Sequence, residues 1–210
     1  SPVQLTRVHL AAGAVVGLGA ALVAVGGSAV AAASKVEIYR VRFETLLKSK
    51  AAGDQFVKML RDFADVTPFS DEDAFRGAER LLNFGFQVGD IIPLMRDLGD
   101  AVGADSERFM RASIALGQMQ AKGRASMEEL NQLAEAGIPA FKILEEQLGL
   151  TQKQMLNLGA QGIASDKAIE ALRRGIQERF AGGMEKASRT NVGLWSNVQA
   201  GITRTMATLG

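Results

Sequence analysis

The residues that could support catalysis are few, and their spacing is poor for it. The 210-residue chain has one histidine, His9, and no cysteine, so it lacks the side chains that build most zinc and thiol sites. Carboxylates occur side by side, at Glu128–Glu129, Glu145–Glu146 and Asp71–Asp73. Adjacent helix positions do not face one another, and acidic residues in a first turn stabilise the helix dipole. We therefore expect these acids to cap helices or meet solvent. We predict no enzyme activity and no catalytic, metal or cofactor-binding residues.

Patterns that bind phosphate or nucleic acid are also missing from the sequence. It has neither a Walker-type phosphate loop nor the strand, glycine-rich turn and helix of a dinucleotide site. Lys and Arg number 24 against 23 Asp and Glu, which leaves a net charge of +1. Such a balance gives no general attraction for a polyanion. Short basic spots such as Arg173–Arg174 have no interleaved aromatic residues. No sequence-specific nucleic-acid partner is expected.

An uncharged stretch lies near the N-terminus. Residues 8–34 contain no Asp, Glu, Lys or Arg. As a helix they would extend about 40 Å, more than the roughly 30 Å apolar core of a bilayer. Small residues form one face that allows close helix contact in a membrane or in a bundle: Gly13, Gly17, Ala20, Ala21 and Ala24. Three interpretations stay open, namely a signal peptide (for which the stretch is long), a helix packed within an assembly, and a membrane-inserting helix.

Behind this stretch the sequence has the periodicity of short amphipathic helices. Apolar residues recur at helical spacing over residues 35–50 and 54–66, and Pro68 stops the second helix. Ser126 with Glu129, and Thr151 with Gln154, match capping boxes. The other expected helices begin at Ser70, Gly89–Asp90, Asp105–Ser106, Pro139 and Ser165, with ends near Gly85, Gly123, Gly137, Gly149 and Gly182–Gly183.

No segment alternates with period two, so the predicted fold class is all-α. We expect a long apolar, membrane-like or assembly helix over residues 1–34. A compact array of short helices follows over residues 35–181, and a C-terminal amphipathic helix over residues 182–210. The last helix carries an apolar stripe of Trp195, Val198, Ile202, Met206 and Leu209.

One block in the middle of the chain is distinctive. It begins ALGQMQAKGRASMEELNQLAEAGIPAF at Ala115 and continues to Leu144, and it resembles the tape-measure domain of long-tailed bacteriophages and prophages. Shorter blocks agree in order from Phe43 onward, so the resemblance covers about residues 36–210. The block's structural residues are expected to be Leu116, Gly117, Gln118, Gly123, Glu129, Leu130, Leu133, Gly137, Ile138 and Pro139. Among them we expect the three glycines and the proline to fix turns. We expect the apolar residues to form a core with Phe141 and Leu144.

The resemblance implies a structural role in a virion. Tape-measure proteins lie inside the tail tube, set tail length, nucleate tube assembly and leave ahead of the DNA. The implied partners are tail-tube and tail-tip proteins and tail assembly chaperones, with a homo-oligomer of few copies. The implied locations are the tail lumen, the host cytoplasm during assembly and the host inner membrane during ejection. As one helix, 210 residues reach only about 315 Å, so we expect one domain of a larger protein.

Two other classes of function stay open. A membrane-anchored helical adaptor would use residues 8–34 as its single spanning helix and the remaining helices as a binding module. A tail-associated enzyme would need a cell-wall hydrolase domain outside these residues, because the chain itself lacks the required side chains.

Overall fold

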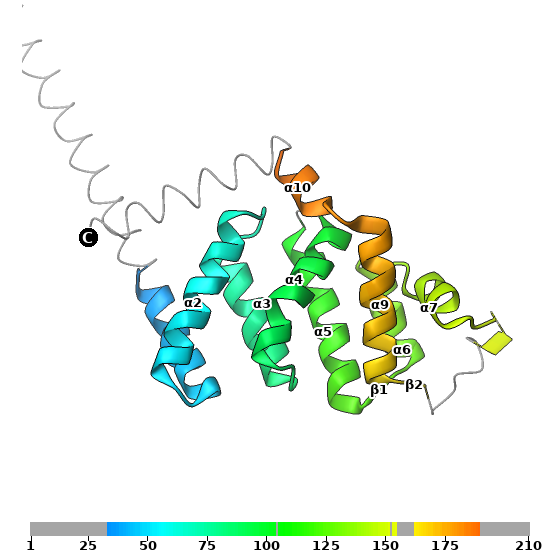
Figure 1. The fold of residues 1–210 in the computed structure, drawn as a ribbon, viewed down its shortest axis with the longest axis horizontal. Coiled ribbons are helices and arrows are strands. Elements are labelled where there is room, and N and C mark those ends of the chain that lie inside the picture. Colours follow the sequence, from blue (N-terminus) through cyan, green and yellow to red (C-terminus); the bar gives the residue numbers. More distant parts are fainter. Residues whose placement is uncertain (1–32, 104, 152, 155–161, 190–210) are drawn as a thin grey trace, which may run out of the picture.

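The computed structural model describes residues 33–103, 105–151, 153–154 and 162–189, and most of them are helical. Figure 1 shows the helices side by side in an elongated array that begins with the helix of residues 33–47. The next elements in chain order are α2 (Lys50–Asp65), α3 (Asp71–Asn83), α4 (Val88–Val102), α5 (Ser106–Lys122), β1 (Arg124–Ala125), α6 (Met127–Glu135) and α7 (Ala140–Leu148). They are followed by β2 (Ile163–Ala164), α9 (Ser165–Phe180) and α10 (Gly183–Ser188).

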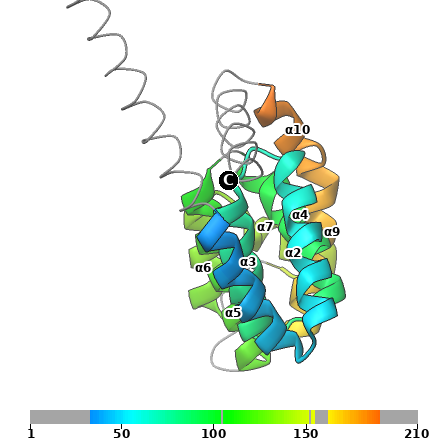
Figure 2. The same cartoon turned by 90° about the vertical axis from the view of Figure 1, so that its left-hand side faces the viewer.

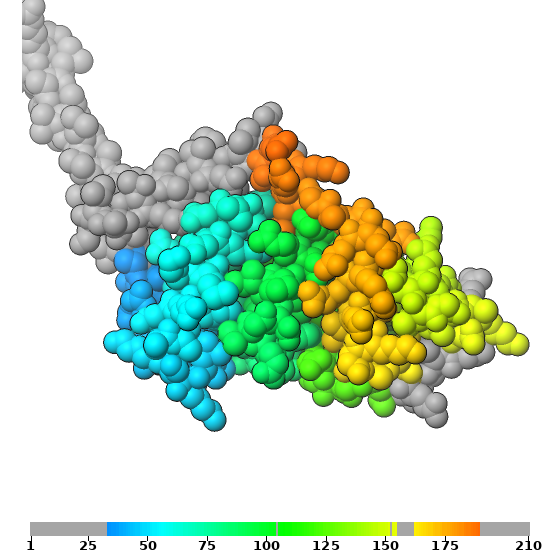
Figure 3. All heavy atoms as spheres, in the orientation of Figure 1, coloured from blue at the N-terminus to red at the C-terminus, as the bar shows by residue number. Residues whose placement is uncertain are grey.

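The helices form two layers. In the turned view of Figure 2, α2, α4 and α9 lie on one side, and α3, α5 and α6 lie on the other. Figure 3 shows one face of the array, over which α2, α4, α9 and α7 form a continuous surface. The longer helices α2, α3, α4, α5 and α9 each bury an apolar stripe, as helical periodicity predicts.

The prediction of a mostly helical chain is confirmed, but a short β-ribbon was missed. β1 and β2 pair antiparallel, with Arg124 opposite Ala164 and Ala125 opposite Ile163. Gly162 precedes β2 with φ +62°, and a Cβ there would lie 2.3 Å from the carbonyl oxygen of Ala125. Two-residue strands are too short to show alternation, so the sequence carries no signal for this pairing.

Several helix boundaries differ from the expected ones because the chain turns where a polar cap is available. The first helix ends at residue 47 rather than 50. Lys48 takes φ +53°, and the Ser49 side chain accepts a hydrogen bond from the Ala52 amide at 3.2 Å. This serine cap starts α2 at Lys50, four residues before the expected position. Ser165 is the first residue of α9 and does not cap it.

An aromatic cluster joins the first helix to the array. Phe43 has no exposed surface, and its ring centre lies 5.0 Å from that of Phe56 and 6.3 Å from that of Phe75. The Tyr39 ring lies 5.0 Å from the Phe75 ring. These edge and tilted contacts connect residues 33–47 with both α2 and α3, so the array begins with a well-packed core.

Two of the expected segments fall mainly outside the described residues. They are the apolar helix of residues 1–34, with its small-residue face, and the part of the C-terminal helix beyond residue 189. Within residues 182–189, α10 is the observed element. None of the helices in the described ranges has the length and apolar character to cross a membrane.

Candidate functional site

The residues expected to be structural in the central block lie along one continuous path. Leu116, Gly117 and Gln118 lie inside α5, and Gly123 follows its last residue. After β1, Glu129, Leu130 and Leu133 lie in α6. Gly137, Ile138 and Pro139 form the connection to α7. The path therefore runs from α5 through β1 into α6, and from α6 through a second turn into α7.

The apolar residues of this path meet in one core, as expected. Leu116 and Leu133 are each 1% exposed, and Leu130, Ile138 and Leu144 are fully buried. Phe141 is only half-buried and packs against the edge of the same core. Truncating a buried leucine in such a core typically costs about 2–5 kcal/mol.

Two of the expected turn glycines do fix turns. Gly123 follows the last residue of α5 with φ +70°, and Gly137 follows α6 with φ +90°. Residues other than glycine rarely adopt such positive φ angles. The carbonyl of Gly123 also accepts a hydrogen bond from the Ser165 amide at 3.1 Å. The helix α7 begins at Ala140 rather than at Pro139, and Pro139 is its N-cap.

Gly117 does not fix a turn, contrary to expectation. It lies within α5, where a Cβ atom would be 2.0 Å from Cδ2 of Phe84. The glycine thus allows the ring of Phe84, the residue directly after α3, to lie on the α5 backbone. Spacing alone gives no indication of this role, because the partner residue lies on another helix.

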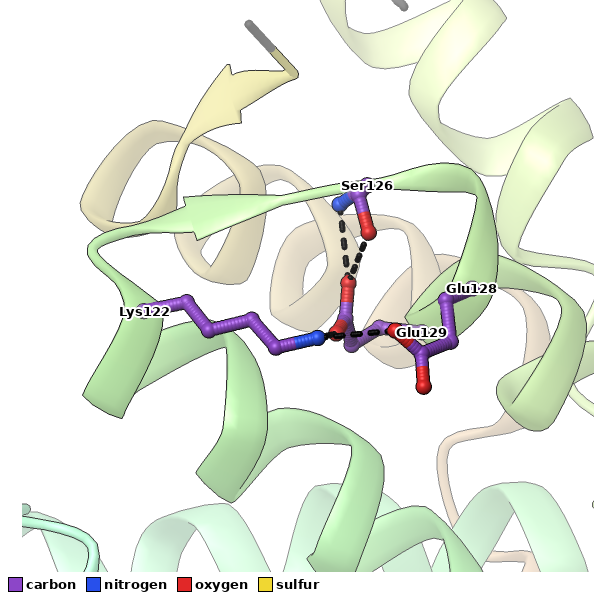
Figure 4. Close-up of polar contacts among 4 residues, drawn as sticks. All are labelled: Lys122, Ser126, Glu128 and Glu129. Atoms are coloured by element: carbon purple, nitrogen blue, oxygen red, sulfur yellow. Dashed lines mark hydrogen bonds and ion pairs between the residues drawn. The ribbon is translucent and has the colours of Figure 1, made fainter. Parts of the chain in front are cut away.

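A buried carboxylate forms the polar centre of the block (Figure 4). Glu129 has no exposed surface, and its Oε2 accepts hydrogen bonds from the Ser126 amide at 2.9 Å and the Ser126 hydroxyl at 2.5 Å. Its Oε1 forms an ion pair with Lys122 at the end of α5. Lys122 Nζ also contacts Glu128 at 2.8 Å. The carboxylate therefore holds the start of α6 and the end of α5 together across β1.

Opposing effects act on the acidity of Glu129. Burial raises the pKa of this carboxyl, but the hydrogen bonds from Lys122 and Ser126 outweigh burial and hold the pKa below its ordinary value. The group is therefore ionised at neutral pH and fully engaged with its neighbours. Among the described residues no cluster of histidine and acidic side chains could hold a metal ion. The arrangement thus suits capping and helix connection.

The oxygen Oε1 of Gln118 is buried without a described hydrogen-bond partner, and nothing in the structure accounts for it.

Sequence reasoning missed two polar contacts between distant segments. The Asp97 carboxylate in α4 accepts hydrogen bonds from Arg173 at 2.7 Å and Gln177 at 2.9 Å, both in α9. The Asp100 carboxylate accepts from the backbone amides of Gly182 at 3.2 Å and Met184 at 3.0 Å, so it caps the start of α10. The partners are about 80 positions apart in the chain, and no local spacing rule connects them.

Comparison with known proteins adds an independent finding. A family model described as tape measure protein matches residues 27–210. The chain is 30% identical over 191 residues to the Mu-like prophage FluMu protein gp42 of Haemophilus influenzae, a match that covers 88% of this chain and 30% of the relative. It is 26% identical over 116 residues to a protein of Escherichia phage Mu described as "Probable tape measure protein", covering 55% of this chain and 17% of the relative. The chain therefore spans less than a third of the length of the curated relatives it matches. No solved structure matches it.

Proposed function

Because the chain belongs to the tape measure protein family, we propose that it is a structural component of a phage tail. The observation that carries this proposal is the family match across residues 27–210, which includes every described helix. The site geometry is in keeping with it, since the central carboxylate and its neighbours connect the end of α5 to the start of α6.

The finer proposal is that the chain contributes to measuring the tail and to building it. It would add to tail length in proportion to its own length, and it would help to nucleate the tail tube together with assembly chaperones. Tail-tube and tail-tip proteins would be its neighbours in the virion, with a few copies of the chain side by side. Support comes from the family, and from a helical array that can be extended at about 1.5 Å per residue.

A length-series experiment tests the ruler role. The segment coding for residues 33–189 would be duplicated in frame in the phage genome that carries this gene, and tail length would be measured by electron microscopy. If the inserted residues extend as helix, tails should lengthen by about 1.5 Å per inserted residue, roughly 240 Å in total. Normal tails of unchanged length would show that this segment does not measure the tail. The tails of the unmodified phage give the reference length.

We also propose that residues 8–34 meet the host membrane during DNA ejection, because the stretch carries no charge and is long enough to cross a bilayer. The full chain should then float with phospholipid vesicles in a density gradient, and a Val16→Asp, Val23→Asp variant should not. A matched control is Val66→Asp, Val88→Asp, which places the same charges at valines that are 64% and 43% exposed in the helical array. Flotation of all three proteins, or of none, would contradict a membrane role for this stretch. Either outcome would also contradict the alternative function of a membrane-anchored adaptor.

A further inference from the structure

A basic pocket lies between the helix of residues 33–47 and α3, apart from the central block. Its volume is ≈ 340 Å³. The charged part of its lining is Arg42 from the first helix and Arg76, Glu79 and Arg80 from α3. Tyr39 and Phe84 supply aromatic walls. The lining thus holds three arginines and one glutamate, which leaves a local excess of positive charge in a chain that is nearly neutral overall.

Two of the three arginines have no partner within the described part of the chain. Arg42 donates to both oxygens of Glu79, at 3.2 and 3.1 Å, and its guanidinium lies 5.3 Å from the centre of the Tyr39 ring. The side chains of Arg76 and Arg80 form no ion pair or hydrogen bond with any described residue. They are four positions apart on α3, so they project from the same face one turn apart.

The walls hold this pocket in a fixed shape. Tyr39 is 9% exposed and packs on Phe75, which anchors one wall in the aromatic cluster. Phe84 forms another wall, and the absence of a side chain at Gly117 lets its ring rest on α5. An occupant would therefore meet arginine donors above a pre-formed aromatic surface.

We propose that this pocket binds a pair of carboxylates on an acidic segment of a partner protein. The planar guanidinium fork matches a carboxylate with two parallel hydrogen bonds, and Arg76 and Arg80 provide one fork for each of two acids. The phosphate backbone of a nucleic acid fits less well, because the carboxylate of Glu79 in the lining would repel it and the pocket volume is only ≈ 340 Å³. The proposal does not depend on the tail function, since it concerns the recognition chemistry of this surface alone.

The test uses the full chain and a hexaglutamate peptide that carries a neutral fluorophore, with binding followed by fluorescence anisotropy at low salt. Removing two charge-assisted forks by Arg76→Gln, Arg80→Gln should weaken binding by about tenfold or more. A variant of equal net charge, Arg96→Gln, Lys142→Gln, changes exposed cations of α4 and α7 outside the pocket and should bind as the wild type does. The Glu79→Gln variant releases Arg42 and should bind several-fold more tightly. Thermal unfolding of each variant would show that it remains folded.

The outcomes separate the proposal from its rivals. Equal weakening in the pocket variant and the charge-matched control would mean that only net charge matters, and would overturn the proposal. Failure of the wild type to prefer hexaglutamate over hexaglutamine with the same fluorophore would overturn it as well. Tighter binding of a single-stranded oligothymidylate that is lost only in the pocket variant would assign the site to nucleic acid instead.

Discussion

Replacement of Phe43 by alanine is expected to lower the free energy of unfolding by about 3–5 kcal/mol. The ring has no exposed surface and is in contact with the rings of Phe56 and Phe75. Removing it would leave a cavity where the first helix meets α2 and α3, and the helices around it can close that space only in part. The measurement is urea unfolding followed by circular dichroism at 222 nm.

A matched control on the same helix is Ile38→Ala, since Ile38 is 51% exposed. Its effect should stay within about 0.5 kcal/mol. If Phe43→Ala were no more harmful than Ile38→Ala, the first helix would not be packed on the array as the structure describes. A separate early transition in the Phe43→Ala protein would instead show that this end of the array unfolds on its own, which is the behaviour of helix arrays with mainly neighbouring contacts.

Replacement of Glu129 by alanine is expected to cost about 2–4 kcal/mol, because a cap is lost and buried donors are left without their acceptor. The Ser126 amide and hydroxyl would lose their partner at the start of α6. Lys122 would keep its contact with Glu128, so that side chain would not be stranded. The exposed neighbour offers the control, and Glu128→Ala should change the free energy of unfolding by less than about 1 kcal/mol.

The contribution of Glu129 should also depend on pH in one direction. Its pKa is lower in the folded chain than its ordinary value, so the unfolded chain binds more protons as the solution becomes acidic. The stabilisation is therefore complete above about pH 5 and decreases as pH falls through about 4 toward the folded pKa. The free energies of unfolding of the wild type and of Glu129→Gln should differ most at neutral pH, and the difference should shrink as the pH falls below the ordinary carboxyl pKa toward the lower folded pKa of Glu129. A difference that stays constant across this range would show that the charge of Glu129 is not what stabilises the turn.

The sequence determined the class of the fold and most helix ends, because those depend on residues close together in the chain. The Ser70 cap of α3, the capping pair of Ser126 with Glu129 and the left-handed glycine after α5 act within a few positions, and all three are present as predicted. The resemblance in the central block pointed to the family, since a long run of matching residues is specific in a way that composition is not.

Tertiary structure alone decided which surfaces meet. The role of Gly117 depends on Phe84, the cap of α10 on Asp100, and the ribbon on the approach of residue 163 to residue 125. The basic pocket likewise exists only because the first helix lies beside α3 and brings Arg42 to Arg76 and Arg80. Helical periodicity states which side of a helix is apolar, but it does not state which neighbour covers that side. Contacts between segments tens of residues apart depend on how all the apolar faces pack at once, and that is settled only in the folded chain.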